Sequence, residues 1–410
     1  MNTENNSVRW EPAMSKMLVL GGCGAQGSAT VMWLLKEPDV SEVICADISL
    51  EKAKEFKDKL KSDKLRPRKV DAWKPDEVLE AAKGVDVVIN MVAAWVGKRS
   101  PAPNVMEAAF KSGAHYIDPA VAYREEEDRM LELDGKWKDA GLTAILDLGK
   151  TPGITNIYAR YAADRLDRVD EIHVKTCLDV MSEKEFLVSW SPVAALTGWS
   201  GPGLVYENGK YKEVPPFSGE DVYSFPNDPR GPCTGYLADH EEVWTLPRFI
   251  KEVQHVEFKH YSHRLPIFRA LGMLFGSDKP IDVKGVRVAP LDMLLALVSP
   301  PAELPEKIKA GLVDDIYSCG VVEVKGEKAG GETLYTLSCP VSLRDVNGIL
   351  PGSQPESILV GTPPAVAATM LSRGEIKTRG IMPPECLDPD PFLVKLAEKG
   401  IRTYEKMERC

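Results

Sequence analysis

The sequence lacks the features of a membrane protein, a nucleic-acid-binding protein or a disulfide-bonded secreted protein. No apolar run reaches the roughly 18 residues that cross a bilayer, and residues 1–15 hold no basic segment followed by an apolar one. The formal net charge is −10 with acids and bases interspersed, which argues against binding to nucleic acid or to anionic lipid. The eight cysteines form no C-x-x-C pair, so we expect reduced thiols in a cytoplasmic protein.

The most informative segment that is present is Lys16–Ser28, in which a buried strand leads through a glycine turn into a helix. Gly22, Gly24 and Gly27 follow the spacing G-x-G-x-x-G. In dinucleotide-binding folds the first glycine permits the turn, the second admits the pyrophosphate, and the third lets helix and strand pack closely. The pyrophosphate would then lie at the helix N-terminus, where unpaired N–H groups attract an anion.

An acidic residue follows at the distance expected for a ribose ligand. Glu42–Asp47 has the pattern of a second strand, and Asp47 lies 20 residues after Gly27. A carboxylate accepts hydrogen bonds from ribose hydroxyls and repels a 2′-phosphate, so NAD is favoured, while Lys52 and Lys54 leave NADP possible. The residues predicted to bind the cofactor are Gly22, Gly24, Ala25, Gln26, Gly27, Asp47, Asp71, Met91 and Val92.

The length of 410 residues exceeds the size at which a single core keeps growing, so we expect more than one domain. Residues 1–15 are polar and expected to be mobile, and residues 16–150 alternate strands with helices, the pattern of an α/β Rossmann domain with a doubly wound parallel sheet. Residues 151–350 are predicted to form a central α+β domain for substrate binding and dimerisation. Residues 351–410 are predicted to supply helices that return to the Rossmann domain.

Short strands and turn signals dominate the central domain. Asn208–Gly209 between alternating apolar residues predicts a β-hairpin. Helices are expected in all three regions of the chain, near 124–139, 267–275, 290–298, 362–374 and 391–400. Strands are predicted at 171–177, 185–190, 203–214, 242–246, 253–261, 314–324 and 333–339.

Several segments along the chain resemble the saccharopine dehydrogenase family. They are Leu18–Gly27, Val87–Asn90, Ala109–Asp118, Thr151–Asn156, and Gly361–Thr362 with Gly380–Glu385. The resemblance covers most of the chain and implies a Rossmann domain, a central α+β domain and a returning C-terminal segment. It also implies hydride transfer between a nicotinamide and a carbon–nitrogen bond of an amino acid or amine, and we expect a homodimer.

The family that the chain resembles includes saccharopine reductases, lysine 6-dehydrogenases and carboxynorspermidine synthases. The resemblance therefore leaves two reactions open, reductive condensation and oxidative deamination. The segment Phe186–Pro192 resembles a stretch near the substrate site of the reductases. Lys150–Thr151 departs from the family pattern, in which an acidic or small residue precedes the Pro-Gly. A second class of function, a sensor or scaffold that binds the dinucleotide without turnover, is the alternative.

Candidate catalytic residues follow from the position of ligands in open α/β sheets, outside the carboxyl ends of the strands. Asp118 could hold a cationic amine, and Tyr123 could assist proton transfer. Lys150 could bind a substrate carboxylate or transfer a proton. Each has a structural alternative: Asp118 as a helix or turn cap, Tyr123 in ordinary packing and Lys150 as a solvated loop residue.

Candidate substrate ligands come from the central domain and the C-terminal segment. A guanidinium pairs with a carboxylate through two hydrogen bonds, so Arg248 and the His263–Arg264 pair are candidates, with ordinary surface residues as the alternative. His255, His260 and His263 have no cysteine or carboxylate at a recognisable ligand spacing, so we predict no metal. The predicted substrate-binding residues are Trp95, Trp190, Arg248, His263 and Thr362.

Overall fold

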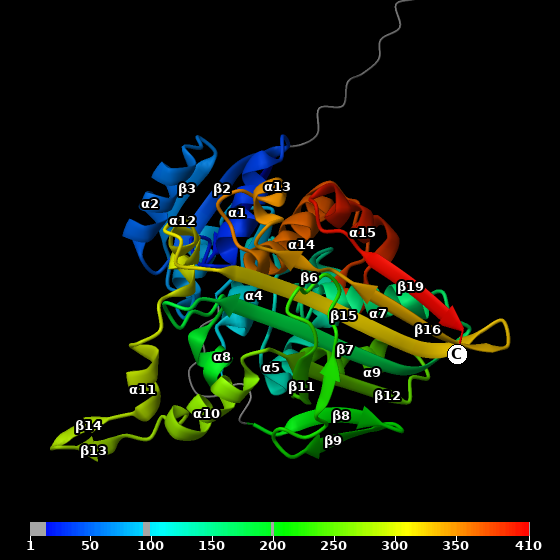
Figure 1. The fold of residues 1–410 in the computed structure, drawn as a ribbon. Coiled ribbons are helices and arrows are strands. Elements are labelled where there is room, and N and C mark those ends of the chain that lie inside the picture. Colours follow the sequence, from blue (N-terminus) through cyan, green and yellow to red (C-terminus); the bar gives the residue numbers. More distant parts are fainter. Residues whose placement is uncertain (1–13, 93–98, 198–200, 410) are drawn as a thin grey trace, which may run out of the picture.

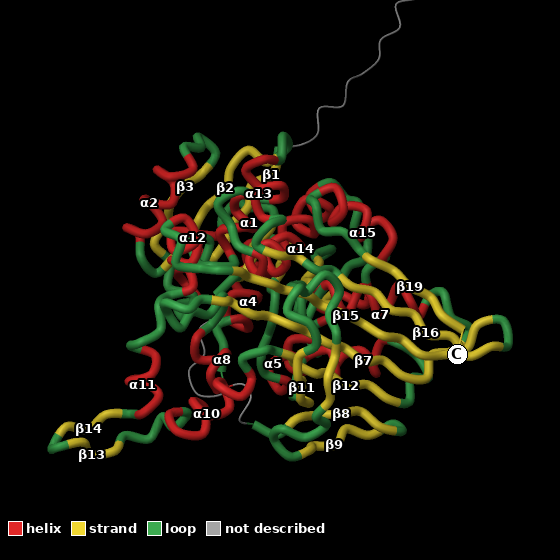
Figure 2. Tube along the Cα trace, in the orientation of Figure 1, coloured by secondary structure: helices red, strands yellow, loops and turns green. Residues whose placement is uncertain are grey.

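The computed structural model describes residues 14–92, 99–197 and 201–409 and contains two large sheets with helices around them (Figure 1). The tube in Figure 2 shows helices gathered around the first sheet, whereas long strands dominate the second. Of the N-terminal segment predicted to be mobile, residues 1–13 lie outside the described residues. Ser15 already belongs to the first strand, where its N–H donates to the carbonyl of Asp39 at 2.8 Å.

The first sheet is a parallel Rossmann sheet of seven strands in the order β18-β6-β5-β4-β1-β2-β3. Its strands are β1 Ser15–Leu20, β2 Val40–Asp47, β3 Leu65–Lys69, β4 Val87–Asn90, β5 His115–Ile117, β6 Thr143–Ile145 and β18 Gly380–Met382. β1 and β4 are buried almost throughout, which explains their continuous apolar runs. The predicted α/β fold is confirmed, and β18 shows that the chain returns to this sheet near its C-terminus.

Helices cover both faces of this sheet. They are α1 Gly27–Lys36, α2 Leu50–Leu60, α3 Pro75–Ala82, α4 Ala102–Ser112, α5 Arg124–Leu131 and α6 Asp134–Asp139, joined by α14 Pro355–Ser372 and α15 Pro389–Glu398 from the C-terminal segment. α14 packs closely on α1, and the Thr30 hydroxyl on α1 donates a hydrogen bond of 2.8 Å to the Gly361 carbonyl on α14. A Cβ at Gly361 would lie 2.6 Å from the carbonyl oxygen of Gln26, so only glycine permits this approach.

The second sheet has ten strands around a central path β10-β11-β12-β7-β15-β16-β19. Its strands are β7 Arg168–Met181, β8 Gly203–Glu207, β9 Lys210–Val214, β10 Asp221–Tyr223, β11 Cys233–Leu237, β12 His255–Tyr261, β15 Asp315–Lys328, β16 Gly331–Ser338, β17 Val341–Ser342 and β19 Tyr404–Arg409. The predicted hairpin is confirmed: β8 pairs with β9, and Asn208 and Gly209 have φ of 48° and 83°. β7 and β12 are parallel neighbours, whereas β15 runs antiparallel to β7.

The two faces of the second sheet differ because side chains alternate along a strand. Ile172, Val174, Val256 and Phe258 point inward and belong to one apolar cluster with strands of the Rossmann sheet and with α7 Ile154–Ala163. The residues between them on β7 and β12 are charged or imidazole side chains on the outer face. The inner face of the second sheet therefore packs against the Rossmann domain, and the outer face presents polar side chains.

Two predicted strands are absent. Residues 242–246 belong to a helix, α9 Glu241–Phe249, in which Glu241 to Leu246 are all buried. Val243, Trp244 and Thr245 favour strands by propensity, but burial in the packed interior selects the helix. The predicted strand 185–190 is a loop that leads into α8 Pro192–Thr197.

The remaining elements include an arm between the second sheet's β12 and β15. It contains α10 Leu265–Phe275, a hairpin of β13 Ile281–Val283 and β14 Val286–Val288, and α11 Pro290–Leu295. Two further helices, α12 Leu304–Lys309 and α13 Val346–Ile349, flank β15 and α14 in sequence. The predicted helix 124–139 is divided into α5 and α6. Among the described residues, no helix is long and apolar enough to cross a membrane.

Candidate active site

The glycine loop joins β1 to α1 through close backbone contacts. The left-handed residue of the turn is Gly21, with φ of 70°, which directly precedes Gly22, the first glycine of the motif. A Cβ at Gly27 would lie 2.3 Å from the carbonyl oxygen of Gly21, so this glycine permits the helix to pack against the strand. A Cβ at Gly24 would lie 3.1 Å from the same oxygen and has no other heavy atom within 4 Å.

The other predicted cofactor ligands lie at the carboxyl edge of the same sheet. Asp47 ends β2, and its carboxylate accepts hydrogen bonds from the thiol of Cys23 at 3.1 Å and the N–H of Ser49 at 3.0 Å. The Cys23 contact fixes the carboxylate of Asp47 beside the glycine loop. Asp71 follows β3, and Met91 and Val92 follow β4.

Two buried aspartates follow β5 and β6. The N–H of Asp147 donates to Oδ1 of Asp118 at 2.9 Å, and the N–H of Val121 donates to Asp147 at 2.7 Å. The second carboxylate oxygen of each aspartate has no hydrogen-bond partner among the described residues. Burial raises the pKa of Asp118 to about 7, and burial together with Glu127 raises the pKa of Asp147 well above its usual range.

The acidic cluster continues into the second domain. Glu127 on α5 is fully buried, and burial with the nearby Glu241 raises its pKa well above the usual range. Glu241, at the start of α9, accepts a hydrogen bond from the N–H of Ala122 at 3.2 Å. Burial raises the pKa of Glu241 as well. The carboxyl ends of the Rossmann strands and the start of α9 therefore share one concentration of buried carboxyl groups.

A histidine lies against this cluster. Nδ1 of His240 is 3.2 Å from Glu241 and forms a short hydrogen bond with Glu242, and its ring stacks on Phe258 with centroids 3.8 Å apart. Burial lowers the pKa of His240, but the two carboxylates outweigh this effect and raise the pKa to about 9. Sequence reasoning missed these residues, although the consecutive letters His-Glu-Glu were a detectable signal.

Lys150 is buried at the junction of the two domains. Its Nζ donates to Glu356 at 2.7 Å and to the hydroxyl of Ser318 at 2.9 Å, which joins the Rossmann loop to α14 and β15. Its side chain is 2% exposed and that of Glu356 is 8% exposed. Its ammonium is thus already paired within the protein.

The Thr151–Asn156 motif builds the turn that follows Lys150. The N–H of Gly153 donates to Asn156 Oδ1 at 2.9 Å, and Asn156 donates to Glu385 at 2.9 Å. The hydroxyl of Thr155 donates to Glu242 at 2.7 Å. This motif therefore ties the end of the Rossmann sheet to α9 and to the C-terminal segment.

The segment Phe186–Pro192 reaches the same region. Gln26 of the glycine loop donates to the carbonyl of Ser189 at 3.0 Å, and the ring of Trp190 lies 6.4 Å from that of His260. Burial lowers the pKa of His260 well below its usual range, and the charges of Lys150 and His240 add to this effect.

The other predicted site residues lie in varied surroundings. Tyr123 is half-buried at the start of α5. Arg248 pairs with Asp128 at 2.6 Å, and Nε2 of His263 lies 3.5 Å from Asp228. Thr362 is fully buried, accepts a hydrogen bond from the Trp33 indole at 2.9 Å and donates to Ile358. Trp95 lies outside the described residues.

Comparison with known proteins agrees with this arrangement. Residues 17–145 match the model of the saccharopine dehydrogenase NADP-binding domain, and residues 149–401 match the saccharopine dehydrogenase C-terminal domain. Among curated proteins, the chain is 26% identical to a carboxyaminopropylagmatine dehydrogenase of Synechocystis sp., with 96% of this chain and 98% of the relative covered. It is 30% identical to a carboxynorspermidine synthase of Vibrio alginolyticus, with 86% and 85% covered.

Among solved structures, the fold is similar to that of a saccharopine dehydrogenase from Saccharomyces cerevisiae described as L-Glu forming. The TM-score is 0.69 at 18% identity, with 96% of this chain and all (100%) of the other chain covered. The glycine loop, the Rossmann sheet and the complete second domain define an NAD(P)-dependent oxidoreductase that acts on a carbon–nitrogen bond. The chain belongs to the saccharopine dehydrogenase family.

Proposed function

We propose that this protein reduces an imine, formed between an amine and an oxo acid, to a secondary amine that carries a carboxylate. The amine substrate in this proposal bears at least one further cationic group, as a polyamine does. The observation that carries the proposal is the concentration of acids where the two domains meet: Asp118, Asp147, Glu127, Glu241 and Glu242. The names of the relatives, a carboxynorspermidine synthase and a carboxyaminopropylagmatine dehydrogenase, support the same substrate class.

The Rossmann domain would hold the dinucleotide by its pyrophosphate and ribose. In this proposal the N–H groups at the start of α1 bind the pyrophosphate, and Gly24 leaves the backbone accessible to it. Asp47 accepts hydrogen bonds from the adenosine ribose, which favours NAD over NADP. The nicotinamide supplies the hydride, and the protein positions the carbon–nitrogen bond.

The acidic cluster would attract and orient the cationic end of the substrate. Burial raises the pKa of Asp118, Asp147 and Glu127, so an ammonium group that reached their unpartnered oxygens would favour the ionised carboxylates and gain strong hydrogen bonds. Asp118 lies at the end of β5, where ligands of parallel sheets bind, and is the acid proposed to hold the amine. Tyr123 is proposed to assist proton transfer from the start of α5.

His240 is the proposed proton donor. With its pKa raised to about 9 by Glu242 and Glu241, the ring is protonated at neutral pH and can give a proton when water leaves during imine formation. Trp190 and His260 are proposed to form the neighbouring wall. Lys150 is proposed to position this wall through Glu356 and Ser318 and to add positive charge toward a substrate carboxylate.

Oxidation of NADH in the presence of paired substrates tests the proposal. We expect turnover only when an amine and an oxo acid are present together, and a rate at least tenfold higher with a diamine than with the matching monoamine. Asp118→Asn should lower that preference. Absence of NADH oxidation with every pair, despite bound NADH, would favour the sensor or scaffold alternative. Equal rates with monoamines and diamines would contradict the polyamine assignment.

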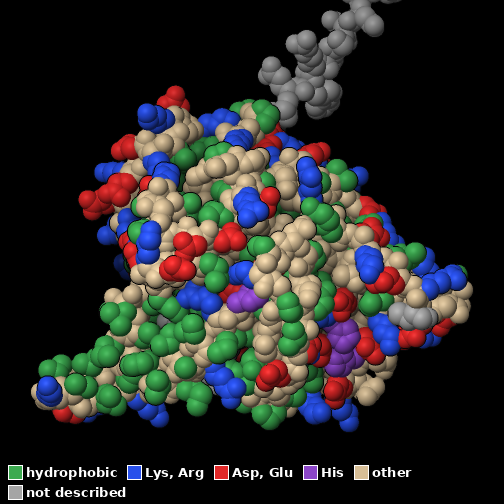
Figure 3. All heavy atoms as spheres, in the orientation of Figure 1, with side chains coloured by type: hydrophobic (Ala, Val, Ile, Leu, Met, Phe, Trp, Pro, Cys, Tyr) green, Lys and Arg blue, Asp and Glu red, His purple; other side chains and the backbone are tan. Residues whose placement is uncertain are grey.

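We also propose that the protein forms a cytoplasmic homodimer through the arm at 265–300. Figure 3 shows apolar side chains gathered over this arm, which projects from the body of the molecule in Figure 1. A two-stranded hairpin such as β13–β14 is only marginally stable alone in water. The exposed apolar side chains are between 46% and 77% accessible and are Ile267, Met273, Leu274, Ile281, Val283, Val286, Met293 and Leu297.

We take a second copy of this chain as the partner that covers the arm, because two-fold dimers are the commonest assemblies of identical chains. Light scattering during gel filtration should give the mass of a dimer. The double variant Met273→Glu, Leu274→Glu should be monomeric, whereas Val394→Glu, an exposed position on α15, should stay dimeric. A monomeric wild type, or a double variant that stays dimeric, would contradict this arm as the interface.

A further inference from the structure

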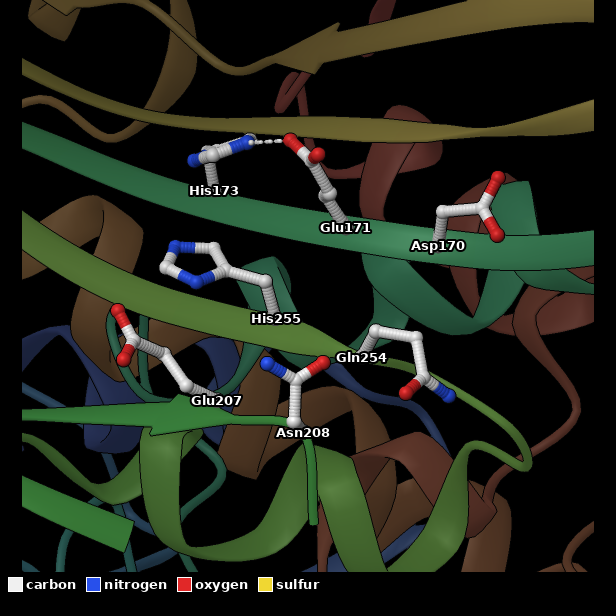
Figure 4. A pocket seen from close by; sticks show the side chains of 7 residues that line it. All are labelled: Asp170, Glu171, His173, Glu207, Asn208, Gln254 and His255. Carbon is white, nitrogen blue, oxygen red and sulfur yellow. Dashed lines mark hydrogen bonds and ion pairs between the residues drawn. The ribbon is translucent and has the colours of Figure 1, made fainter. Parts of the chain in front are cut away.

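A second polar cluster lies on the outer face of the second sheet, opposite the proposed active site. β7 and β12 are parallel neighbours, and their register pairs Glu171 with His255 and His173 with Glu257. These four side chains alternate with the inward residues of the same strands, so they form a square on the outer face. Figure 4 shows three of them, Glu171, His173 and His255, at an open pocket of about 400 Å³.

The donor atoms in this square converge. Nδ1 of His173 lies 3.0 Å from Oε1 of Glu257, and Nε2 of His255 lies 3.4 Å from Oε2 of the same carboxylate. One nitrogen from each histidine and one oxygen of Glu257 all lie within 4.8 Å of one another. A single ion bound by two imidazoles and one carboxylate needs ligand atoms at such separations, because each lies about 2 Å from the metal.

A second carboxylate orients one of the two imidazoles. Nε2 of His173 forms a hydrogen bond of 3.0 Å with Glu171 (Figure 4). This bond turns Nδ1 of the same ring toward Glu257. Histidines that bind metals typically donate their other ring nitrogen to a carboxylate, which fixes the tautomer and the ring orientation. Glu171 therefore occupies the position of a carboxylate that orients a metal-binding histidine without contacting the metal itself.

The surrounding charge favours a cation. Asp170, Glu171 and Glu207 line the pocket beside Glu257, while Lys259 approaches Glu257 at 3.6 Å and also bonds to Asp221 at 2.8 Å. Lys325 on β15, which pairs with Glu171 in the sheet register and bonds to Glu332 at 2.7 Å, is a second cation, and acids outnumber these two lysines around the histidines. Asn208 and Gln254 also line the opening, which leaves room for a water molecule as a further ligand.

We propose that His173, His255 and Glu257 bind a Zn²⁺ ion, with Glu171 orienting His173 and water completing a tetrahedral site. Two imidazoles favour zinc and neighbouring transition metals, whereas Mg²⁺ and Ca²⁺ prefer oxygen ligands. Because the proposed ligands come from β7 and β12, the ion would clamp these strands together. His255 contacts Glu207 across the β12–β8 pairing, so the clamp would also steady the β8–β9 hairpin. The role inferred for the ion is stabilisation, since the site is on the face opposite His240 and Asp118.

The separation along the sequence explains why spacing alone did not indicate this site. His173 and His255 are 82 residues apart, and only the parallel pairing of their strands brings them together. Glu257 lies two residues after His255, a spacing that places both on one face of a strand but has no meaning for a helix or a loop. The prediction that the chain has no metal site is therefore replaced by this proposal.

Titration calorimetry with Zn²⁺ on the untagged, chelator-treated full chain tests the site. We expect one ion per chain and a rise in melting temperature when zinc is added. His255→Gln and Glu257→Gln should each weaken binding at least tenfold and remove the rise. Glu171→Gln should weaken it by about tenfold, as expected for an outer-shell partner. Mg²⁺ should give no comparable heat or stabilisation.

Asp170→Asn is the matched control, because it removes a negative charge from the same pocket without removing a proposed ligand. It should bind zinc within about twofold of the wild type. Co²⁺ serves as a spectroscopic probe, since ligation by histidine and carboxylate lacks the thiolate charge-transfer absorption that a cysteine site would give. A wild type that binds no zinc, ligand variants that bind it equally well, or a thiolate band from Co²⁺ would each overturn the proposal.

Discussion

The side-chain amide of Gln26 donates a hydrogen bond of 3.0 Å to the carbonyl of Ser189, 163 residues further along the chain. The same carbonyl accepts a second hydrogen bond of 3.0 Å from Gln354, at the start of α14. The glycine loop, the Phe186–Pro192 segment and the C-terminal segment therefore meet at one backbone oxygen. A change in the conformation of the glycine loop should therefore shift the Phe186–Pro192 segment of the second domain, which supplies the proposed substrate wall.

Two glycines of the loop should respond differently to substitution. Gly24→Val should fold and lose dinucleotide affinity, because the new side chain occupies the proposed path of the pyrophosphate. Gly27→Ala should instead lower stability by about 1–3 kcal/mol, because its Cβ would lie 2.3 Å from the carbonyl oxygen of Gly21. Fluorescence titration with NADH and thermal unfolding separate the two effects.

Gly135→Ala is the control for this pair, since a Cβ at Gly135 in α6 meets no heavy atom within 4 Å. It should leave NADH affinity unchanged. Undiminished NADH affinity in Gly24→Val would contradict the pyrophosphate site.

Cofactor preference should depend on Asp47. The wild type should favour NAD over NADP in steady-state kinetics, because the carboxylate repels a 2′-phosphate. Asp47→Ser combined with Ile48→Arg should narrow or reverse the ratio of kcat/KM with NAD to kcat/KM with NADP, since Ile48 is exposed and adjoins Asp47, the proposed ribose ligand. Equal use of both cofactors by the wild type would show that Asp47 does not select between them.

The Rossmann domain could be predicted because its signals are local. The glycine spacing, the apolar runs of β1 and β4 and the turn residues each lie within a few consecutive positions, and neighbouring elements pack on one another in chain order. The Asn208–Gly209 hairpin is local in the same way. Asp118 could be selected from its place after a parallel strand.

The rest of the proposed site depends on contacts between distant segments. His240 directly precedes α9 and Glu242 lies within it, and residues 242–246 of this helix were predicted as a strand, because Val243, Trp244 and Thr245 have strand propensity. The partner of Lys150 is Glu356, 206 residues away, and no sequence pattern links them. The acids are buried because α5 and α9 pack at the edge of the sheet. Secondary-structure propensity does not predict this packing.

The buried pair of Lys150 and Glu356 should contribute strongly to stability. Lys150→Met leaves the carboxylate of Glu356 buried without its cation, which should cost about 3–5 kcal/mol of unfolding free energy. Lys59→Met, which breaks the exposed pair with Glu306, should change stability by less than about 1 kcal/mol. Urea unfolding measures both.

The double variant Lys150→Met, Glu356→Gln should recover part of the lost stability, because no buried charge is left unpaired. A rise in KM for the oxo acid in Lys150→Met, measured below its melting temperature, would show that the lysine also attracts the substrate carboxylate. Wild-type stability in Lys150→Met would mean that the pair contributes nothing.

The pH dependence of stability and activity should depend on His240. The fold raises the pKa of this residue from 6.5 to about 9 through Glu242, Glu241 and Asp239, so the folded state favours the protonated ring. The resulting stabilisation is complete below pH 6.5 and is lost as the pH rises through about 9. Relative to His240→Gln, the wild type should therefore lose about 2–3 kcal/mol across that range.

Activity should follow the same group if His240 donates the proton. The wild-type kcat should fall as the pH rises through about 9, whereas His240→Gln should show a kcat at least about a hundredfold lower and without this limb. His115→Gln, which changes a histidine at the far end of β5, should keep the wild-type profile. A pH-independent stability difference between wild type and His240→Gln would show that the ring is not held protonated, and an unchanged kcat limb in the variant would assign the proton to another group.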